Sequence, residues 1–349
     1  MVRGGRLAFG FLLISIVVAS SPARGADELD CPATSTPDGK VPAAAIVPLP
    51  DGGEDYIFCI SGVATHSPVP PEGFSPVRAS DAQLEEYAFP PRPADKEQLA
   101  SWTSLMSEWK PSADPPSFSV DTSVRFSSSL NWSGHEASPN ASSRWVAVQG
   151  DFHEYGWHNS ACNNERIGSW VGLGGEGGGL LQAGTAMQGS PSYYAWYEYI
   201  GATSPPPVVL NNVTVHAGDH IHILVSYQTS NNHASFYVQD SQTATSQSAT
   251  VTLGGSYYDG NFAEWIDERP GGNASHSDGL FNLAKYNSNA WFNTEAENDN
   301  SNWTKLGNAN AHHQIVMYNN GGTELSNPGS IGADNESFTD NWEACADGT

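Results

Sequence analysis

Two polar side chains stand in apolar, aromatic stretches of this chain, where their types can do chemistry. Gln182 lies within Leu180-Leu-Gln-Ala-Gly184, and Glu264 lies within Asn261-Phe-Ala-Glu-Trp-Ile-Asp267. An amide or carboxyl in such surroundings is costly unless it has partners or a task. A carboxyl can transfer protons, and an amide can donate to an oxyanion at any pH because it does not titrate. The two segments therefore indicate a pair for acid–base chemistry.

The strand around Glu264 favours a titrating role. In an extended strand, residues 262, 264, 266 and 268 share one face, so Glu264 would lie beside Phe262 and Ile266. Apolar neighbours disfavour the charged carboxylate, which predicts a raised pKa and proton transfer in acidic medium. The alternatives are a surface glutamate on an edge strand and, for Gln182, an ordinary buried amide bonded to backbone.

Aromatic segments accompany the pair in a recognisable order. They are Asn131-Trp-Ser-Gly134, Trp170-Val-Gly-Leu173 and Tyr194-Ala-Trp-Tyr-Glu-Tyr199. Together with Gln182 and Glu264, these segments resemble the glutamic peptidases, also called eqolisins, over roughly residues 126 to 340. The resemblance implies a secreted acid endopeptidase built on a β-sandwich.

The resemblance also implies roles for single residues. Glu264 would take a proton from a water, Gln182 would stabilise the tetrahedral oxyanion, and neither a metal nor another cofactor would be needed. Trp170 and Trp196 match tryptophans that line the family's substrate cleft, with core aromatics as the alternative. Trp132 and Glu198 are further candidate substrate-binding residues, although Glu198 also fits a cross-strand partner.

The chain departs from the pattern of fungal members at three positions. Gly174, Ala186 and Tyr194 stand where those members carry aspartates near the site. With fewer carboxyls near the site, an extremely acidic pH optimum is in doubt. The resemblance to a peptidase does not depend on these three positions.

Composition limits the cellular location and the classes of binding partner to be expected for this chain. Residues 1–25 resemble a signal peptide, with Arg3 and Arg6 ahead of an apolar run, which predicts secretion. The formal net charge of -24, from 38 Asp and Glu against 14 Lys and Arg, argues against nucleic acid or an anionic membrane as a partner. The same acidity fits either plain solubility or adaptation to acid. We expect polypeptide substrates and a monomer.

The four cysteines of an exported chain suggest disulfides, and three pairings are possible. Cys31 and Cys59 precede the recognised domain, whereas Cys162 and Cys345 lie near its start and end. Pairing within each region is the simplest prediction.

Residues 26–120 differ in texture from the rest and read as a propeptide-like leader. Frequent prolines favour extended and turn conformations over one compact sheet. A capping box at Ser80-Asp-Ala-Gln83 predicts one short helix. An apolar face at helical spacing predicts a second one, which would press on its own small core or on the catalytic domain; its residues are Leu99, Trp102, Leu105, Met106 and Trp109. We expect this leader to lie across the cleft as an intramolecular inhibitor.

Residues 121–349 predict the catalytic domain, an all-β antiparallel sandwich of the lectin-like jelly-roll kind. Alternating apolar residues on either side of Ala217-Gly-Asp219, from Val213 to Val225, indicate two strands around a turn. His220 and His222 on the polar face of the second strand are expected to be solvent-exposed, with no third metal ligand in sight.

Two rival functions remain for such a sandwich. One is a glycoside hydrolase that uses Glu264, Asp267 and Glu268, but Asp267 falls on the wrong strand face for that role. The other is a carbohydrate-binding module, which gives no reason for a leader of about a hundred residues.

Overall fold

The computed structural model describes residues 31, 39–93, 96–122, 131–140, 142–156, 162, 165–175, 179–189, 192–201, 205–254, 257–273 and 277–345, without the side chains of residues 97, 98 and 101. The expected signal peptide, residues 1–25, lies outside this part. Among the described residues, no helix combines the length and the apolar character needed to cross a membrane.

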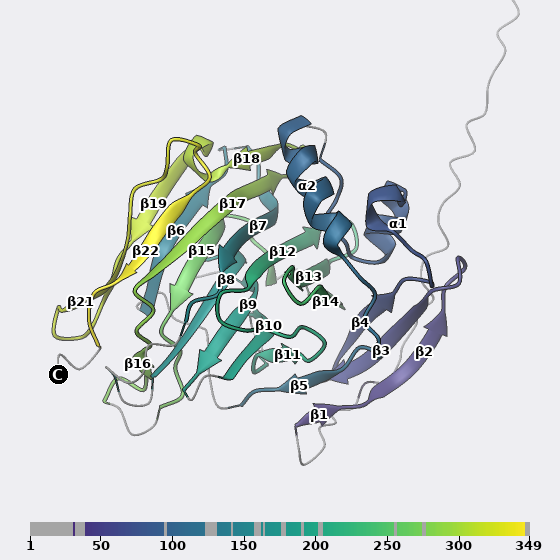
Figure 1. The fold of residues 1–349 in the computed structure, drawn as a ribbon, viewed down its shortest axis with the longest axis horizontal. Coiled ribbons are helices and arrows are strands. Elements are labelled where there is room, and N and C mark those ends of the chain that lie inside the picture. Colours follow the sequence, from purple (N-terminus) through teal and green to yellow (C-terminus); the bar gives the residue numbers. More distant parts are fainter. Residues whose placement is uncertain are drawn as a thin grey trace, which may run out of the picture. The chain divides into compact units, whose positions relative to one another are not determined.

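Two sheets, antiparallel except for one short strand, form a β-sandwich, which confirms the predicted fold class (Figure 1). Sheet A has the strand order β1 (Lys40–Val41), β5 (Phe118–Val120), β11 (Val208–Leu210), β10 (Ser192–Ile200), β9 (Leu180–Gln188), β8 (Glu165–Gly174), β15 (Phe262–Glu268), β6 (Trp132–Ser138) and β19 (Ala311–Ile315), with β16 (Asn282–Leu283) parallel to β8. Sheet B has the order β2 (Ala43–Pro48), β3 (Glu54–Ile60), β4 (Val63–Val69), β14 (Thr245–Thr252), β13 (His233–Asp240), β12 (His220–Gln228), β7 (Trp145–His153), β17 (Ser288–Asn298), β22 (Phe338–Trp342), β21 (Glu324–Pro328) and β20 (Met317–Tyr318), with β18 (Trp303–Lys305) on β17. The helical elements are η1 (Pro76–Arg78), α1 (Asp81–Glu86), α2 (Lys96–Glu108) and η4 (Leu306–Asn308).

The main core fills the space between the two sheets. Successive strand residues point to opposite faces, so every second side chain of each sheet enters this core. Val171 of β8 and Trp265 of β15 meet Ile223 and Val225 of β12 there. Trp265 Nε1 also donates to the carbonyl oxygen of Gln149 in sheet B, at 2.7 Å. The alternate residues of sheet A therefore face away from the core, and we call that side the outer face of sheet A.

The predicted strand pair around residues 217–219 is only half right. β12 begins at His220, but residues 211–219 form turns and irregular backbone. Their backbone N–H groups bond to side chains instead of a strand ladder, since Thr214 N donates to Thr245 Oγ1 and Asn212 N to Gln247 Oε1, both at 2.9 Å. The alternating apolar pattern before the turn correctly indicated buried side chains, but these residues do not form a strand.

The leader forms strands, contrary to the expectation from its prolines. Its β2–β4 strands extend sheet B, because β4 pairs with β14 through Thr65 and His66. Its β1 and β5 extend sheet A, because β5 pairs with β11. Within these strands, Pro48 is the last residue of β2 and Pro68 the second-last of β4, and a missing N–H costs little near a strand end. The leader is therefore built into both sheets of the sandwich.

The two predicted helices of the leader are confirmed. Ser80 Oγ accepts from Gln83 N, and the Gln83 side chain accepts from Ser80 N, which is the predicted capping box of α1. In α2, Trp102 and Met106 are buried in a second apolar cluster together with Leu224 of sheet B. This cluster lies on the face of sheet B that points away from the main core, as the position of α2 beside the β12 and β13 strands in Figure 1 illustrates.

Both predicted disulfides are present. Cys31 pairs with Cys59 within the leader, and Cys162 pairs with Cys345 within the catalytic region. Disulfides persist in oxidising compartments, which suggests an extracellular protein.

Candidate active site

Gln182 and Glu264 lie in one row across three neighbouring strands. Gly172 of β8 pairs with Gln182 of β9 on one side and with Glu264 of β15 on the other. Two strand spacings separate the pair, which is about 10 Å between their Cα atoms. Their strand neighbours Leu181 and Ala263 enter the main core, so the pair points to the outer face of sheet A. Both side chains are nevertheless fully buried in the full-length chain.

Two glycines make room for the carboxyl group of Glu264. A Cβ atom on Gly172 would lie 3.0 Å from Glu264 Oε2 and 2.7 Å from Trp170 Cζ3. A Cβ atom on Gly175 would lie 2.9 Å from Glu264 Oε1, and its φ of +138° is a conformation that favours glycine. The glycine-rich stretch after Trp170 thus lets the backbone approach the carboxyl closely.

Gln182 is oriented by a carboxylate on its other side. Glu198 of β10 stands directly opposite Gln182, and Gln182 Nε2 donates to Glu198 Oε2 at 2.9 Å. Glu198 is buried, with 3% of its surface exposed. Of the two interpretations of Glu198, the structure favours the cross-strand partner that holds the glutamine amide.

The three tryptophans gather beside this row. Trp170 and Trp196 flank Gly184 in the next row of sheet A, and Trp132 packs edge-on against Trp170 with ring centroids 4.9 Å apart. A Cβ atom on Gly184 would lie 2.7 Å from Trp170 Cβ, so a larger residue would displace that tryptophan. All three belong to an apolar cluster separate from the main core. The structure therefore brings together all six candidate residues on one face.

Glu268 is a site residue that the sequence interpretation missed. It is fully buried on the same strand face as Glu264, where Trp170 Nε1 and Asn131 Nδ2 donate to it, both at 2.9 Å. Burial raises the pKa of Glu268 well above its usual range, and the charge of Glu198 adds to this against the opposing hydrogen bonds. The alternation of residues 262–268 did place Glu268 on that face, but nothing in the sequence showed its depth.

Comparison with known proteins assigns the family. Residues 130–334, more than half of the chain, match the Peptidase A4 family. The chain belongs to this family. Two crystal structures of scytalido-glutamic peptidase, one with a transition-state analogue inhibitor and one with a peptide-based transition-state analogue, share its fold at 18% identity, with TM-scores of 0.51 and 0.50. Each covers 61% of this chain and 98% of the peptidase chain. No curated protein sequence matches the chain.

The matched segment of this Peptidase A4 member contains every candidate site residue, whereas the leader strands β1–β5 lie outside it. The chain is therefore a peptidase by family, with an additional N-terminal region that extends the family fold.

The carboxyl arrangement does not suit the rival glycoside hydrolase. Asp267 points into the main core, where Ser169 and Asn289 donate to it. Glu264 and Glu268 share a face, but they are four residues apart on one strand, which is about 13 Å. Paired carboxyls of glycosidases lie roughly 5–9.5 Å apart.

The histidines of β12 are not the solvent-exposed pair that the sequence predicted. His222 is buried, with 3% exposed, and its Nδ1 lies 2.6 Å from Asp151 Oδ1. His220 Nε2 lies 3.8 Å from the same oxygen. Asp151 is buried, which by itself raises its pKa, but the two histidines outweigh this and hold the pKa well below its usual range. A cavity of about 300 Å³ under α2 borders this group.

Proposed function

We propose that this protein is a secreted glutamic endopeptidase in which Glu264 and Gln182 act on one water. The observation that carries the proposal is their common row on the outer face of sheet A, with Gly172 between them. Gly172 places no side chain of its own between them, although Trp170 and Leu180 border that space. The family membership supports a peptidase, and the residue types support the glutamic kind.

The chemistry follows from the two groups. Glu264 accepts a proton from a water held between the two side chains, and that water attacks the scissile carbonyl. Gln182 Nε2 then stabilises the oxyanion, and its orientation is fixed in advance by Glu198. Glu264 passes the proton to the leaving amine. Exclusion of solvent strengthens each of these interactions.

The tryptophans suit a polypeptide substrate. Trp132, Trp170 and Trp196 give the same face a large apolar wall one row away from the pair. Aromatic surfaces can bind substrate side chains of many shapes, since most of the binding energy comes from burying apolar area. We propose that they line the substrate cleft, with Glu198 acting through Gln182 rather than on the substrate.

The leader is proposed to keep the enzyme inactive, although not through its helix. Trp102 of α2 packs on sheet B, whereas Gln182 and Glu264 lie on the outer face of sheet A. Helix α2 therefore holds the leader in place from the opposite side of the sandwich. Its contact with Leu224 is apolar, as the acidity of both parts requires.

The connection between β5 and β6 is the part of the chain that can block the site. These strands are six positions apart in sheet A, which is about 29 Å. Residues 121–131 span at most about 36–40 Å when extended. Residues 123–130 themselves lie outside the described part.

Both ends of the connection make contacts on the outer face of sheet A. Asp121 Oδ2 accepts from Tyr194 OH at 2.9 Å and from Gln188 Nε2 at 2.7 Å, and both donors are outer-face residues of sheet A. Asn131 at the other end donates to Glu268 on that same face. Both described ends of the connection therefore contact the face that bears the proposed catalytic pair, and we propose that the uncleaved leader restricts access to that pair.

Contacts of the segment before the connection bear on where the leader is cleaved from the catalytic domain. Cleavage is expected between the leader and the catalytic domain, within residues 111–125, and hydrogen bonds hold part of this segment: Asn212 Oδ1 accepts from Ser117 N at 2.9 Å, and Asn212 Nδ2 donates to the carbonyl oxygen of Pro115 at 2.9 Å. Residues 118–120 form β5. We propose cleavage after Thr122, which would leave β5 attached to sheet A without a covalent link.

Acid treatment of the full-length protein tests this proposal. The purified chain and its Glu264→Gln variant would be moved from neutral pH to about pH 4, near the usual carboxyl pKa values. We expect the wild type to gain casein-degrading activity together with a cut after Thr122, read by mass and N-terminal sequence. An uncut chain that is fully active would contradict the inhibitory role, and a cut chain that is inactive at every acidic pH would contradict the peptidase assignment.

A further inference from the structure

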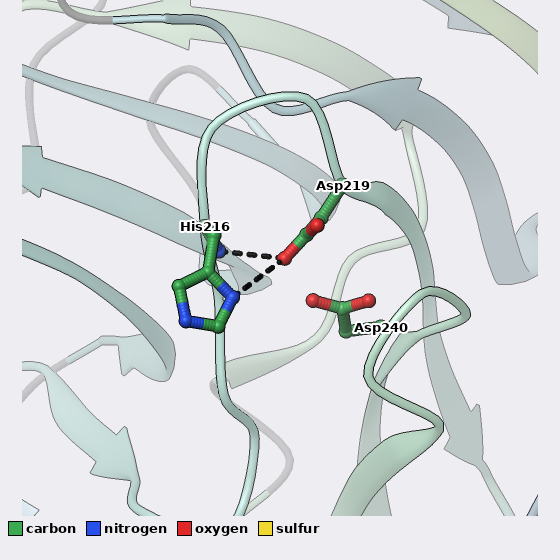
Figure 2. Close-up of side chains that lie close together, drawn as sticks. All are labelled: His216, Asp219 and Asp240. Carbon is green, nitrogen blue, oxygen red and sulfur yellow. Dashed lines mark hydrogen bonds and ion pairs between the residues drawn. The ribbon is translucent and has the colours of Figure 1, made fainter.

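A histidine and two aspartates face one another at the rim of sheet B, away from the catalytic pair. His216 and Asp219 bracket the turn that leads into β12, and Asp240 ends β13. One ligand atom from each residue lies within 4.8 Å of the other two. Figure 2 shows the three side chains pointing toward a common point, with Asp240 approaching from the end of β13.

The turn fixes Asp219 in place. Asp219 N donates to the carbonyl oxygen of His216 at 3.2 Å, and Gly218 between them has a φ of +86°, which favours glycine. Asp219 Oδ2 accepts from His216 N at 2.7 Å and lies 3.1 Å from His216 Nδ1. Backbone bonds between Glu154 and residues 218–219 tie the turn to the end of β7.

Asp240 brings a buried oxygen that has no hydrogen-bond donor among the described residues. Its Oδ1 accepts from Gln242 N at 2.7 Å and from Thr243 N at 3.0 Å. Its Oδ2 is buried and accepts no hydrogen bond from any residue that the structure describes. The whole residue is 0% exposed. A buried carboxylate oxygen without a partner is costly, so a ligand with positive charge is expected opposite it.

The described part of the chain offers no basic side chain for that place. Neither Asp219 nor Asp240 forms an ion pair with a lysine or arginine among the described residues, and His216 is the ionic partner of Asp219. Two facing carboxylates repel each other unless a proton or a cation lies between them. The geometry of the three side chains and the lack of a basic partner therefore both favour a bound cation.

We propose that His216, Asp219 and Asp240 bind one divalent cation, with Zn²⁺ as the best fit. Imidazole nitrogen favours Zn²⁺ over the hard cations Ca²⁺ and Mg²⁺, and carboxylate oxygens are accepted by Zn²⁺ as well. Three protein ligands leave a fourth position for water. The exposed His216 ring, 64% accessible at the side chain, can turn its nitrogen toward the cation.

The bound cation links the two open ends of the β12–β13 hairpin. It joins the turn before β12 to the end of β13, so its effect is on the stability of sheet B and not on the peptidase chemistry. The catalytic pair lies on the outer face of sheet A, which separates the two sites.

Titration calorimetry of the full-length, chelator-treated protein with ZnCl₂ at neutral pH tests the proposal, alongside thermal melting. The parent for both is the Glu264→Gln variant, which prevents self-digestion. We expect one tight site and a melting temperature that rises with Zn²⁺. His216→Ala and Asp240→Asn should each weaken Zn²⁺ binding at that site by at least about tenfold. Even the loss of a residue that only hydrogen-bonds a metal ligand lowers metal affinity by about 10–100-fold. The control is His313→Ala, which removes an exposed histidine of β19 and should leave the site unchanged.

Two outcomes would overturn the proposal. One is a parent protein that neither binds Zn²⁺ nor gains melting temperature with it. The other is tight binding that survives His216→Ala unchanged, because that exposed side chain can be removed without disturbing the fold. A folded His216→Ala protein keeps the test decisive even if Asp240→Asn does not fold.

Discussion

Acidic pH should stabilise this fold because of a carboxyl pair in its core. Asp267 of β15 and Asp340 of β22 are both fully buried between the sheets. Ser133 Oγ and Ser326 Oγ each donate to Asp340 Oδ1 at 2.8 Å, and Asn289 Nδ2 donates to Asp267 Oδ1 at 2.9 Å. Burial raises the pKa of Asp267 to about 6, and burial together with the charge of Asp267 raises the pKa of Asp340 well above its usual range.

The sign and size of the effect follow from these pKa values. Between about pH 4 and pH 6 the folded chain holds a proton on Asp267 that the unfolded chain has lost, so the free energy of unfolding falls as pH rises. A rise from 3.8 to about 6 corresponds to about 3 kcal/mol, at about 1.4 kcal/mol for each pKa unit. This stability is fully present below about pH 4 and is lost as pH rises through about 6.

Asp340→Asn should remove the part of the pH dependence that the Asp340 proton contributes, because asparagine does not titrate, whereas the part that comes from burial of Asp267 stays. The asparagine oxygen can keep accepting from the two serines, and its amide can donate to the Asp267 carboxylate, which then ionises without a like charge beside it. Relative to its parent, the variant should gain unfolding free energy as the pH rises from 4 to 7, because only the parent holds the Asp340 proton more tightly in the folded chain than in the unfolded chain.

Urea unfolding followed by tryptophan fluorescence measures this difference at pH 4, 5, 6 and 7. All variants would carry Glu264→Gln, so that self-digestion does not interfere. Asp114→Asn, at an exposed aspartate, is the control and should follow the parent at every pH. The reasoning would be refuted if Asp340→Asn changed the unfolding free energy by the same amount at pH 4 and at pH 7.

Two further substitutions probe the site and the leader. Gly172→Ala should reduce casein turnover by about 100-fold or more, comparable to losing one oxyanion donor, since its Cβ would press on Glu264 and Trp170. Gly156→Ala, where a Cβ meets nothing within 4 Å, should have no effect; equal activities of the two variants would dismiss the steric argument. Trp102→Ala should destabilise the precursor by about 3–5 kcal/mol and expose the leader to an added protease at neutral pH. A digestion rate equal to that of wild type would show that α2 does not hold the leader.

The sequence placed Glu264 on the same strand face as residues 262, 266 and 268, which the structure confirms, because strand alternation is a local property. Glu264 and its neighbours alternate in a seven-residue strand, and Gln182 lies in a nine-residue strand of the same sheet. Their shared row with Gly172 is set by the register of three strands, which no local pattern encodes. The family resemblance supplied that pairing in place of a physical derivation.

Long-range packing explains what the sequence did not predict. The leader residue Phe118 is buried in the main core, yet the proline content around it favoured irregular structure. Glu268 and His222 looked like ordinary polar positions, but Asn131 and Asp151 from distant segments bury and bond them. The position of α2 likewise depended on an apolar patch of sheet B, including Leu224, that reads from sequence as one more half-buried strand.

Casein hydrolysis at acidic pH by wild type, Glu264→Gln and Gln182→Ala is the most direct test of the central claim. All three proteins would first be cut at the same position, verified by mass, and shown to be folded by their melting curves. The proposed chemistry predicts near-complete loss of turnover for Glu264→Gln and a loss on the order of 100-fold or more for Gln182→Ala. Turnover by folded Glu264→Gln at the wild-type rate would contradict it.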